Sequence, residues 1–233
     1  MSLILDCPIE IVRTSRRKTA SIKILNGQVQ VVIPEYLSEE RLEQLILKRT
    51  SWIRQKLKIQ SLHSTPKSKE YVSGECFTYL GKNYRLKLMQ SEMDEVRLRR
   101  GNLEVGISLH LSGPDRQALI RQKLVHWYES HALERLEEKT DRYSKILGVT
   151  PKSVSVRNYR SRWGSCSIKG EVSYDWRIII APHHIVDYVV VHELCHMLEH
   201  NHSAAFWRCI ENILPQCHES RDWLKLNGCR LFV

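Results

Sequence analysis

Residues 192–196 read His-Glu-Leu-Cys-His, and these residue types at this spacing could hold and use a metal ion. On a helix, positions four apart lie on one face, so the imidazoles of His192 and His196 could bind one ion together. Glu193 would lie beside them, where a carboxylate can take a proton from a metal-activated water. A metal in such a site lowers the pKa of the water and polarises the scissile group of the substrate. The segment therefore predicts metal-dependent hydrolysis.

The helix around this motif is strongly apolar, which bears on whether the histidines are ligands or core residues. Its apolar positions are Ile185, Val186, Val189, Val190, Leu194 and Leu198. Ionisable groups in the middle of a buried helix need a reason, because burying unpaired polar groups costs free energy. The alternative interpretation is a set of hydrogen-bonded core histidines. The pattern favours a metal site over that alternative.

A catalytic zinc site needs a third protein ligand and an open position. His202 lies six residues after His196, the offset at which metzincin-type motifs place their third histidine. Those motifs turn the chain at a glycine, where this sequence has Glu199. His200-Asn201 could make the turn instead, since Asn tolerates a left-handed backbone. His202 is the preferred third ligand, and the other candidates for this position are His200, Glu199 and Glu211. A set of three histidines favours zinc as the metal.

A basic, aromatic segment precedes the motif and is the candidate substrate-binding site. Arg160 and Arg162 lie close together with Trp163 beside them, and Gly164-Ser165 predicts a flexible stretch with backbone donors. The planar fork of arginine suits phosphate or carboxylate oxygens, and Trp163 could stack on a base. The segment could instead be an edge strand with which a peptide pairs. A third interpretation is a structural turn whose arginines pair with acidic helix residues.

Local patterns predict the elements that position these residues. Residues 154–159 read as a strand, and the alternation of apolar residues from Val172 to Ile178 is typical of a half-buried strand. Ala181-Pro182 opens a helix that we expect to run to about His200. Ser203 is the expected N-cap of the next helix. Upstream, residues 112–147 read as a long helix with proline in its first turn, ending at Gly148.

The first part of the chain predicts short strands and one helix. Strands are expected over residues 9–12, 21–25, 29–33, 76–80, 84–88, 96–98 and 103–107, with Asn26-Gly27 as a hairpin turn. Apolar residues at helical spacing predict a helix from Ser38 to about Ile59, and residues 61–69 read as a loop. We therefore expect an α+β fold, with a β-rich N-terminal region over residues 1–110 and a catalytic domain over residues 111–233.

The chain has 233 residues and a formal net charge of +10. Residues 1–110 hold 19 Lys/Arg against 12 Asp/Glu, and residues 111–233 hold 17 against 14, so most of the excess lies in the first part. A basic surface favours anionic partners such as nucleotides, nucleic acid or acidic proteins. A solvated surface is the preferred interpretation. A solvated surface is also the preferred interpretation of the basic cluster Arg13-Thr-Ser-Arg-Arg-Lys18. Because this cluster lacks interleaved aromatic residues, nucleic acid is not favoured as a partner.

Other features narrow the class of protein. No apolar run approaches membrane-spanning length, and the first residues do not resemble a secretory signal, so no membrane partner and a cytoplasmic location are expected. Seven cysteines at irregular spacing predict neither a disulfide framework nor a cysteine-based zinc finger. Cys195 points off the ligand face and Cys217-His218 has no partner spacing for a second metal, so we expect both to be structural. The sequence does not indicate the oligomeric state.

Three ordered motifs resemble a known family. They are Arg160-Ser-Arg-Trp-Gly-Ser-Cys166, Val191-His-Glu-Leu-Cys-His196 and Asn201-His-Ser-Ala-Ala-Phe-Trp207. Together they resemble the YgjP-like metallopeptidase-domain family, which is related to the SprT-like and WLM zincins, and the resemblance extends over the whole chain. One departure is Asp175, where the family pattern has Asn; it could alter local hydrogen bonding and leaves the metal motif untouched.

The resemblance implies a zincin-like core, in which an active-site helix packs on a small antiparallel sheet. It implies zinc bound by His192, His196 and His202, with Glu193 as the catalytic base. The resemblance favours a metallopeptidase, but some members of the family are described as UTP pyrophosphatases, and fold does not fix function. The substrate is therefore expected to be a peptide or, as the alternative, a nucleotide. A third hypothesis is a basic binding module with a structural metal.

Overall fold

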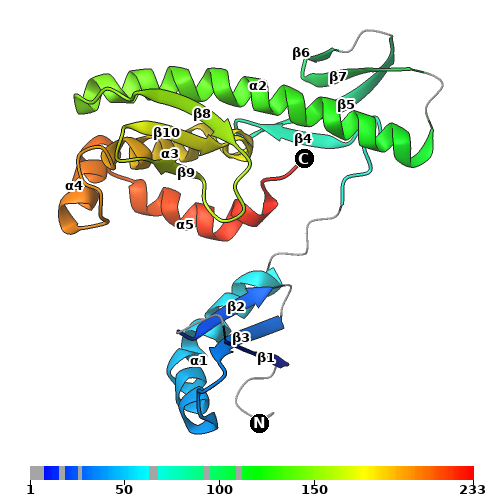
Figure 1. Ribbon diagram of the computed structural model, residues 1–233. Coiled ribbons are helices and arrows are strands. Elements are labelled where there is room, and N and C mark those ends of the chain that lie inside the picture. Colours follow the sequence, from blue (N-terminus) through cyan, green and yellow to red (C-terminus); the bar gives the residue numbers. More distant parts are fainter. Residues whose placement is uncertain (1–7, 16–18, 26–27, 63–67, 92–94, 109–111) are drawn as a thin grey trace. The chain divides into compact units, whose positions relative to one another are not determined.

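The computed structural model describes residues 8–15, 19–25, 28–62, 68–91, 95–108 and 112–233, which divide into two units, Met1–Lys67 and Ser68–Val233 (Figure 1). In the N-terminal unit, β1 (Ile9–Thr14) runs parallel to β3 (Gln28–Pro34), and β2 (Ser21–Leu25) pairs antiparallel with the other edge of β3. The helix α1 (Glu39–Leu62) completes this unit. Alternate residues of β3 point to one face, so Val29, Val31 and Ile33 are fully buried. They share a core with Leu42, Ile46 and Ile53 of α1.

Arg13, the first residue of the basic cluster, is used inside the N-terminal unit. Its guanidinium donates hydrogen bonds to the carbonyl oxygens of Glu35 and Leu37 and pairs with the carboxylate of Glu39. The side chain therefore ties the end of β1 to the start of α1. Residues 16–18 of the cluster lie outside the described residues.

The second unit begins with a four-stranded sheet in the order β4-β5-β7-β6. Its strands are β4 (Cys76–Tyr79), β5 (Lys82–Gln90), β6 (Val96–Arg99) and β7 (Asn102–Ile107). The central pair, β5 and β7, is parallel, and each outer strand pairs antiparallel. The long helix α2 (Gly113–Leu147) follows and ends at Gly148, whose left-handed backbone terminates it as the sequence predicts.

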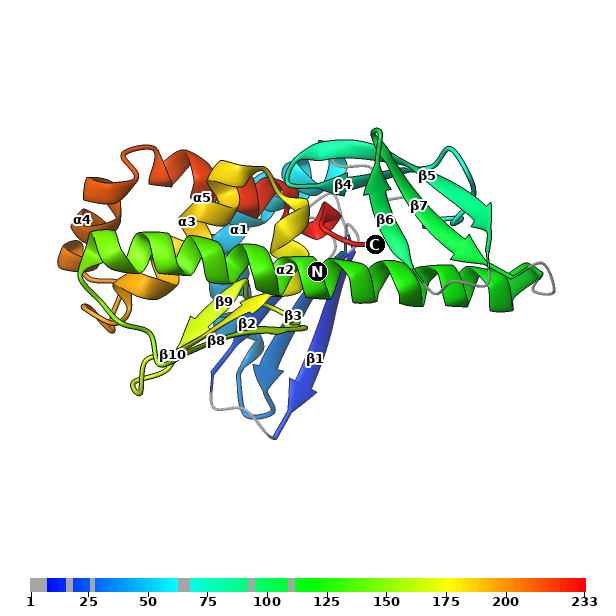
Figure 2. The same cartoon turned by 90° about the horizontal axis from the view of Figure 1, so that it is seen from above.

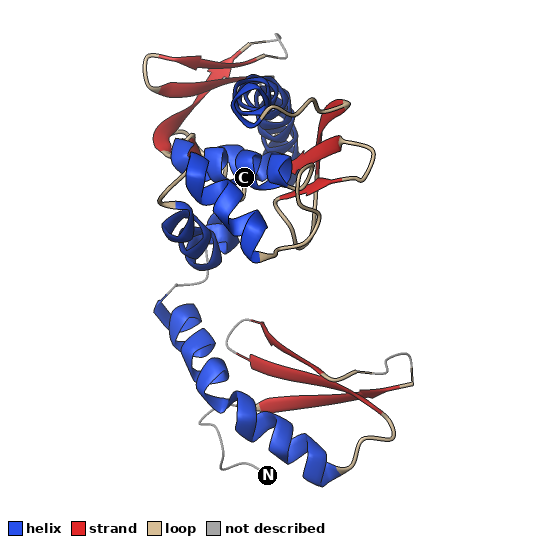
Figure 3. Ribbon diagram, turned by 90° about the vertical axis from the view of Figure 1, so that its left-hand side faces the viewer, coloured by secondary structure: helices blue, strands red, loops and turns tan. Residues whose placement is uncertain are grey.

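The remaining elements complete the second unit. They are the strands β8 (Ser153–Arg157), β9 (Gly164–Cys166) and β10 (Glu171–Asp175), the 3-10 helix η1 (Trp176–Ile180), the helices α3 (His183–Cys195), α4 (Ala204–Ile213) and α5 (Cys217–Asn227), and the 3-10 turn η2 (Gly228–Arg230). The helix α2 lies between the four-stranded sheet and the β8-β10-β9 sheet (Figures 2 and 3). It buries one face that includes Leu124, Tyr128 and Leu136 in the core that it shares with α3.

The structure divides the chain at a different place from the boundary expected after residue 110. The four-stranded sheet belongs to the second unit, because it packs on α2 and is hydrogen-bonded to η1. The N–H of Leu80 donates to the carbonyl of Ile179 over 2.8 Å. Gly81 lies so close to Pro182 that an added Cβ would be 2.8 Å from the proline Cα. The sheet thus braces the start of α3, which sequence periodicity does not show.

Three local expectations also need correction. The small sheet is mixed and not wholly antiparallel, since β8 runs parallel to β10 while β9 runs antiparallel to it. The strand predicted to reach Ile178 ends at Asp175, whose side chain accepts a hydrogen bond from the N–H of Arg177 and starts η1. The helix expected to run to His200 ends at Cys195. The α+β class is confirmed, and none of the helices in the described ranges has the length and apolar character needed to cross a bilayer.

Candidate metal centre

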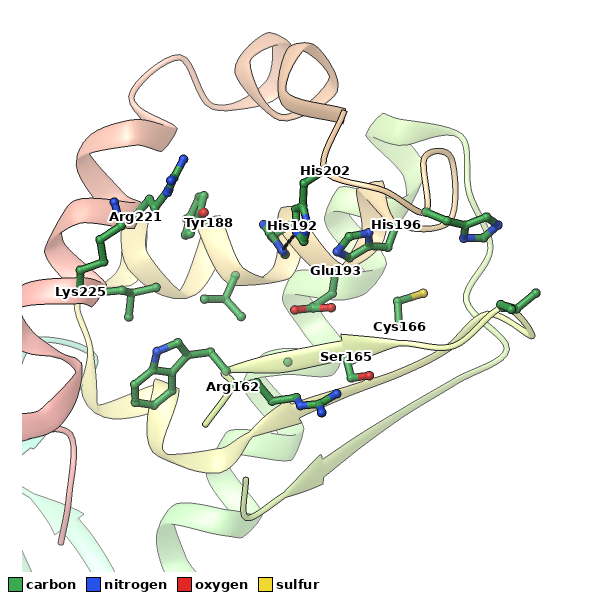
Figure 4. A pocket seen from close by; sticks show the side chains of 16 residues that line it. Arg162, Ser165, Cys166, Tyr188, His192, Glu193, His196, His202, Arg221 and Lys225 are labelled. Atoms are coloured by element: carbon green, nitrogen blue, oxygen red, sulfur yellow. Dashed lines mark hydrogen bonds between the residues drawn. The ribbon is translucent and has the colours of Figure 1, made fainter. Parts of the chain in front are cut away.

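Three histidine side chains come together at the end of α3. His192 lies in the last turn of α3, His196 follows directly after it, and His202 lies two residues before α4. One ring nitrogen from each lies within 4.8 Å of the others, and Nε2 of His202 is 3.2 Å from Nε2 of His192. Figure 4 shows the three rings close together, with Arg221 and Lys225 on one side of them and Cys166 on the other. The structure brings together the three residues that the sequence predicts as ligands.

The chain turns between His196 and His202 without the glycine of metzincin-type motifs. The N–H groups of Met197 and Leu198 donate to the carbonyls of Leu194 and Cys195, so a tight right-handed turn follows α3. Among the described non-glycine residues, positive φ angles occur only at Tyr71, Leu80 and Arg100. The expected left-handed Asn201 is therefore wrong.

The ring of Phe206 packs against all three histidines. This ring is fully buried and lies 4.6 Å from the ring of His196, 4.7 Å from that of His202 and 5.0 Å from that of His192, measured between centroids. Ser203 caps α4 by accepting a hydrogen bond from the Phe206 N–H, as the sequence predicts. The cap and the ring contacts fix the start of α4 beside His202.

The protonation and hydrogen bonding of the histidines fit a metal ion. Burial, together with the neighbouring His196 and His202, lowers the pKa of His192 to about 3, and burial also lowers the pKa of His196. Nδ1 of His196 lies 3.2 Å from the carbonyl oxygen of Glu199, which leaves Nε2 to bind a metal. Neutral imidazoles are the form that coordinates a metal, so this donor set fits zinc.

Glu193 lies between the histidines and β9. Its side chain is 6% exposed, and burial raises its pKa to about 8, while the nearby Arg162 guanidinium acts in the opposite direction. Gly164 of β9 lies directly against it: a Cβ added there would be 2.6 Å from Cγ and 2.7 Å from Oε1 of Glu193. Only glycine leaves room for the carboxylate at this point. The sequence predicts Gly164-Ser165 as flexible, whereas both residues belong to a strand.

A cleft of about 710 Å³ opens beside Glu193 and the three histidines. One wall is formed by β9 and the residues before it, and another by α5. Arg162 and Trp163, two of the residues predicted to bind substrate, line this cleft. Arg160 does not: it lines a neighbouring depression of about 390 Å³ together with Arg177 and residues of η2. Arg162 and Trp163 line both spaces, so Arg160 lies next to the cleft but does not line it.

Asp175 fixes the segment that carries Arg162 and Trp163. Its fully buried carboxylate accepts hydrogen bonds from the N–H of Tyr159 and from the backbone and side chain of Arg177. The Arg177 guanidinium also donates to the carbonyl of Tyr159 and lies 5.9 Å from the ring of Trp163. The position at which the sequence departs from the family pattern thus holds one wall of the cleft.

The cleft contains residues that the sequence did not suggest. They include Tyr188 on α3 and Arg221, Leu224 and Lys225 on α5. The residues at 221, 224 and 225 lie on one face of a helix because of their spacing. No local signal connects that face to a motif more than 20 residues earlier. Only the fold of α4 and α5 back along α3 places it there.

A second group of possible ligands lies at the junction of α4 and α5. Glu211, Cys217 and His218 each offer one atom, and these atoms lie within 4.8 Å of one another. Nε2 of His218 is 2.9 Å from Oε1 of Glu211. Glu211 is one of the alternatives considered for the third ligand of the His-Glu-x-x-His motif. The structure places it in this second group.

Comparison with known proteins gives one family and one solved structure. The profile of the family described as YgjP-like, metallopeptidase domain, matches residues 18–227. The crystal structure of the metallopeptidase zymogen of Pyrococcus abyssi abylysin matches with 26% identity over 37% of this chain and 89% of that chain, with a TM-score of 0.35. Comparison with curated proteins gave no match.

The family match covers most of the chain. It includes the basic segment, the motif at residues 192–196 and the residues around His202. The resemblance drawn from the three motifs is therefore confirmed, and it supports a metal-dependent hydrolase. The chain belongs to the YgjP-like metallopeptidase-domain family.

Proposed function

We propose that this protein is a zinc-dependent peptidase whose peptide substrate pairs with the free edge of β9. The observation that carries the proposal is the position of this strand. Among the described strands only β10 pairs with β9, all three β9 residues line the cleft, and Gly164 lies against Glu193. An extended peptide paired with that edge would have its backbone beside Glu193 and the histidines. Main-chain pairing of this kind suits hydrolysis of an amide bond.

Zinc is the metal proposed for the three histidines. Bound there, a zinc ion would polarise the substrate carbonyl and activate a water molecule for attack. A structural zinc site has four protein ligands, whereas a catalytic site has three and an open position. His192, His196 and His202 form a group of three within the described chain. This count favours a catalytic centre over a binding module with a structural metal.

Glu193 is the residue proposed to move protons. It takes a proton from the attacking water and passes it to the leaving amine. Its burial and raised pKa of about 8 favour a group that can hold a proton for part of the cycle. Arg162, which favours the charged carboxylate, acts against that rise and keeps the base form accessible. Gly164 supplies the space that the carboxylate occupies.

The test compares zinc-loaded wild type with Glu193→Gln on a mixed peptide library, with products identified by mass spectrometry. We expect the variant to keep its zinc and to lose about 100- to 10,000-fold in cleavage rate, the range typical of a general base. Glu211→Gln is the matched control, because it makes the same change outside the cleft, and should cleave normally. Cleavage by Glu193→Gln at the wild-type rate would contradict the proposal.

A nucleotide pyrophosphatase is the second candidate, and the basic side chains of the cleft favour it. Arg162, Arg221 and Lys225 could neutralise the charge that develops on a phosphoryl group. The measurement is pyrophosphate release from UTP by zinc-loaded wild type and Glu193→Gln. Release that disappears in the variant would establish this activity and count against the peptidase. No release from either protein would remove the nucleotide candidate.

A further inference from the structure

One wall of the cleft carries positive charge from a helix that the motif does not include. Arg221 and Lys225 lie four residues apart on α5 and both line the cleft, with Leu224 between them. Figure 4 shows the two cations to one side of the three histidines, whereas Arg162 lies below Glu193 in this view. The cleft therefore has a cationic wall, Arg221 and Lys225, separate from the catalytic groups.

Arg221 is held in place by an aromatic ring that also contacts the histidines. Its guanidinium carbon lies 4.9 Å from the centroid of the Trp207 ring, a cation–π contact. The Trp207 ring in turn stacks on His202, with centroids 6.0 Å apart. The cation thus lies one ring away from the metal-binding residues.

Arg221 has no carboxylate partner among the described residues. Within the described residues Arg221 makes no ion pair, whereas Nζ of Lys225 lies 2.5 Å from Oδ1 of Asp222. Tyr188 faces the same part of the cleft; its hydroxyl makes no hydrogen bond to the described residues, and burial raises its pKa to about 12, so it remains a donor. Of the described side chains that line the cleft, Glu193 carries the only carboxylate.

We propose that Arg221, assisted by Lys225, binds a carboxylate of the peptide substrate beside the scissile bond. The inference rests on the proposed peptidase function and names its substrate class. The planar guanidinium matches the two oxygens of a carboxylate, and its contact with Trp207 orients the fork before the substrate arrives. The carboxylate could belong to an Asp or Glu side chain or to the C-terminus of the peptide.

The test uses two forms of a mixed peptide library, one with free C-termini and one with amidated C-termini. For a side-chain carboxylate, we expect wild-type zinc protein to enrich Asp and Glu at one fixed distance from the cleaved bond in both forms. For a terminal carboxylate, cleavage should be confined to the free form, at a fixed distance from the end. Both outcomes support the proposal, and they distinguish its two sources.

Arg221→Glu reverses the charge and should lower cleavage of the preferred peptides about tenfold or more, as for loss of a charge-assisted hydrogen bond. If the source is a side chain, the variant should also gain a preference for Lys and Arg at the same position. That exchange would not follow from a merely structural role for Arg221. Arg208→Glu, on the exposed face of α4, makes the same change of net charge outside the cleft and should leave the preference unchanged.

A second measurement distinguishes failure of this inference from failure of the proposed function: the same peptide libraries are passed over immobilised, zinc-loaded Glu193→Gln, and the retained peptides are identified. Cleavage by wild type with no preference for carboxylates would overturn the inference and leave the peptidase intact. If acidic peptides are retained, if Arg221→Glu abolishes that retention, and if wild type does not cleave them, the binding site is supported and the peptidase function is overturned. If wild type does not cleave the peptides and Glu193→Gln does not retain them selectively, the inference and the proposed function are both overturned. Both are also overturned if the protein binds UTP, loses that binding in Arg221→Glu and does not bind acidic peptides.

Discussion

The histidines at the end of α3 and the group Glu211, Cys217 and His218 at the α4–α5 junction both place three possible ligand atoms within 4.8 Å. The two groups differ in what those atoms already contact. In the second group, His218 lies 2.9 Å from the Glu211 carboxylate, so each satisfies the other. Cys217 is fully buried, and burial raises the pKa of its thiol, which opposes the thiolate form that binds metals.

The histidine group differs in its support, its protonation and its surroundings. Its rings are held by Phe206, two of its members have lowered pKa values, and it lies at a cleft with a buried carboxylate beside it. Proximity of ligand atoms is therefore a weak criterion by itself. A metal centre also needs donor atoms that are unprotonated, and a catalytic one needs space for a substrate.

The largest expected difference between the two groups concerns metal content. His196→Ala removes one of three ligands, so we expect zinc to fall from about one ion per chain to nearly none and peptide cleavage to fall to background. His218→Ala should keep about one ion and normal cleavage. Metal analysis after dialysis against a weak chelator measures both. Two ions on the wild-type protein, with one lost in His218→Ala, would contradict the comparison.

The next effect concerns the space beside the carboxylate. Gly164→Ala would place a methyl group 2.6 Å from Cγ of Glu193, so the base must move. We expect kcat/KM to fall about 10- to 100-fold, as for a catalytic group displaced by about an ångström. Zinc content should be unchanged, because the three atoms nearest to the added methyl group all belong to Glu193. Full activity in this variant would show that the position of Glu193 is not critical.

The smallest effect concerns the stability of the zinc-free protein at mildly acidic pH. The pKa of folded His192 is about 3, below its ordinary value of 6.5, so the unfolded chain binds the proton more readily. The stability that the neutral, buried His192 contributes to the folded state is fully present above pH 6.5 and is lost as the pH falls toward 3. It adds about 1.4 kcal/mol per pH unit to the decline in unfolding free energy below pH 6.5.

Urea titrations of chelator-treated protein at pH 7.0, 6.0 and 5.0 measure this decline. His192→Gln should flatten it, because glutamine does not titrate. His218→Gln, the matched change in the second group, should leave it as in wild type. An equal decline in wild type and His192→Gln would mean that His192 is not buried in the neutral form, and the contrast between the two groups would weaken.

Much of the fold could be predicted from the sequence where local patterns are strong. The α+β class, the strands of both parts, α1 and the limits of α2 follow from alternation, helical spacing, Pro114 and Gly148. Predictions were wrong where a side-chain cap or a tertiary contact overrides a local pattern. The capping carboxylate of Asp175 ends β10 early, and hydrogen bonds of the four-stranded sheet to η1 join that sheet to the second unit.

The pairing of the two histidines was determined by the sequence, because the four-residue spacing places His192, in α3, and His196, at its C-terminal cap, on one face in any fold that keeps the helix. The family membership follows from the same motifs. Only the tertiary structure decided the rest: that Gly164 touches Glu193, that Arg160 lies outside the cleft, and that Arg221 and Lys225 lie inside it. These contacts join residues about 30 positions or more apart, and no local pattern records how the chain returns upon itself.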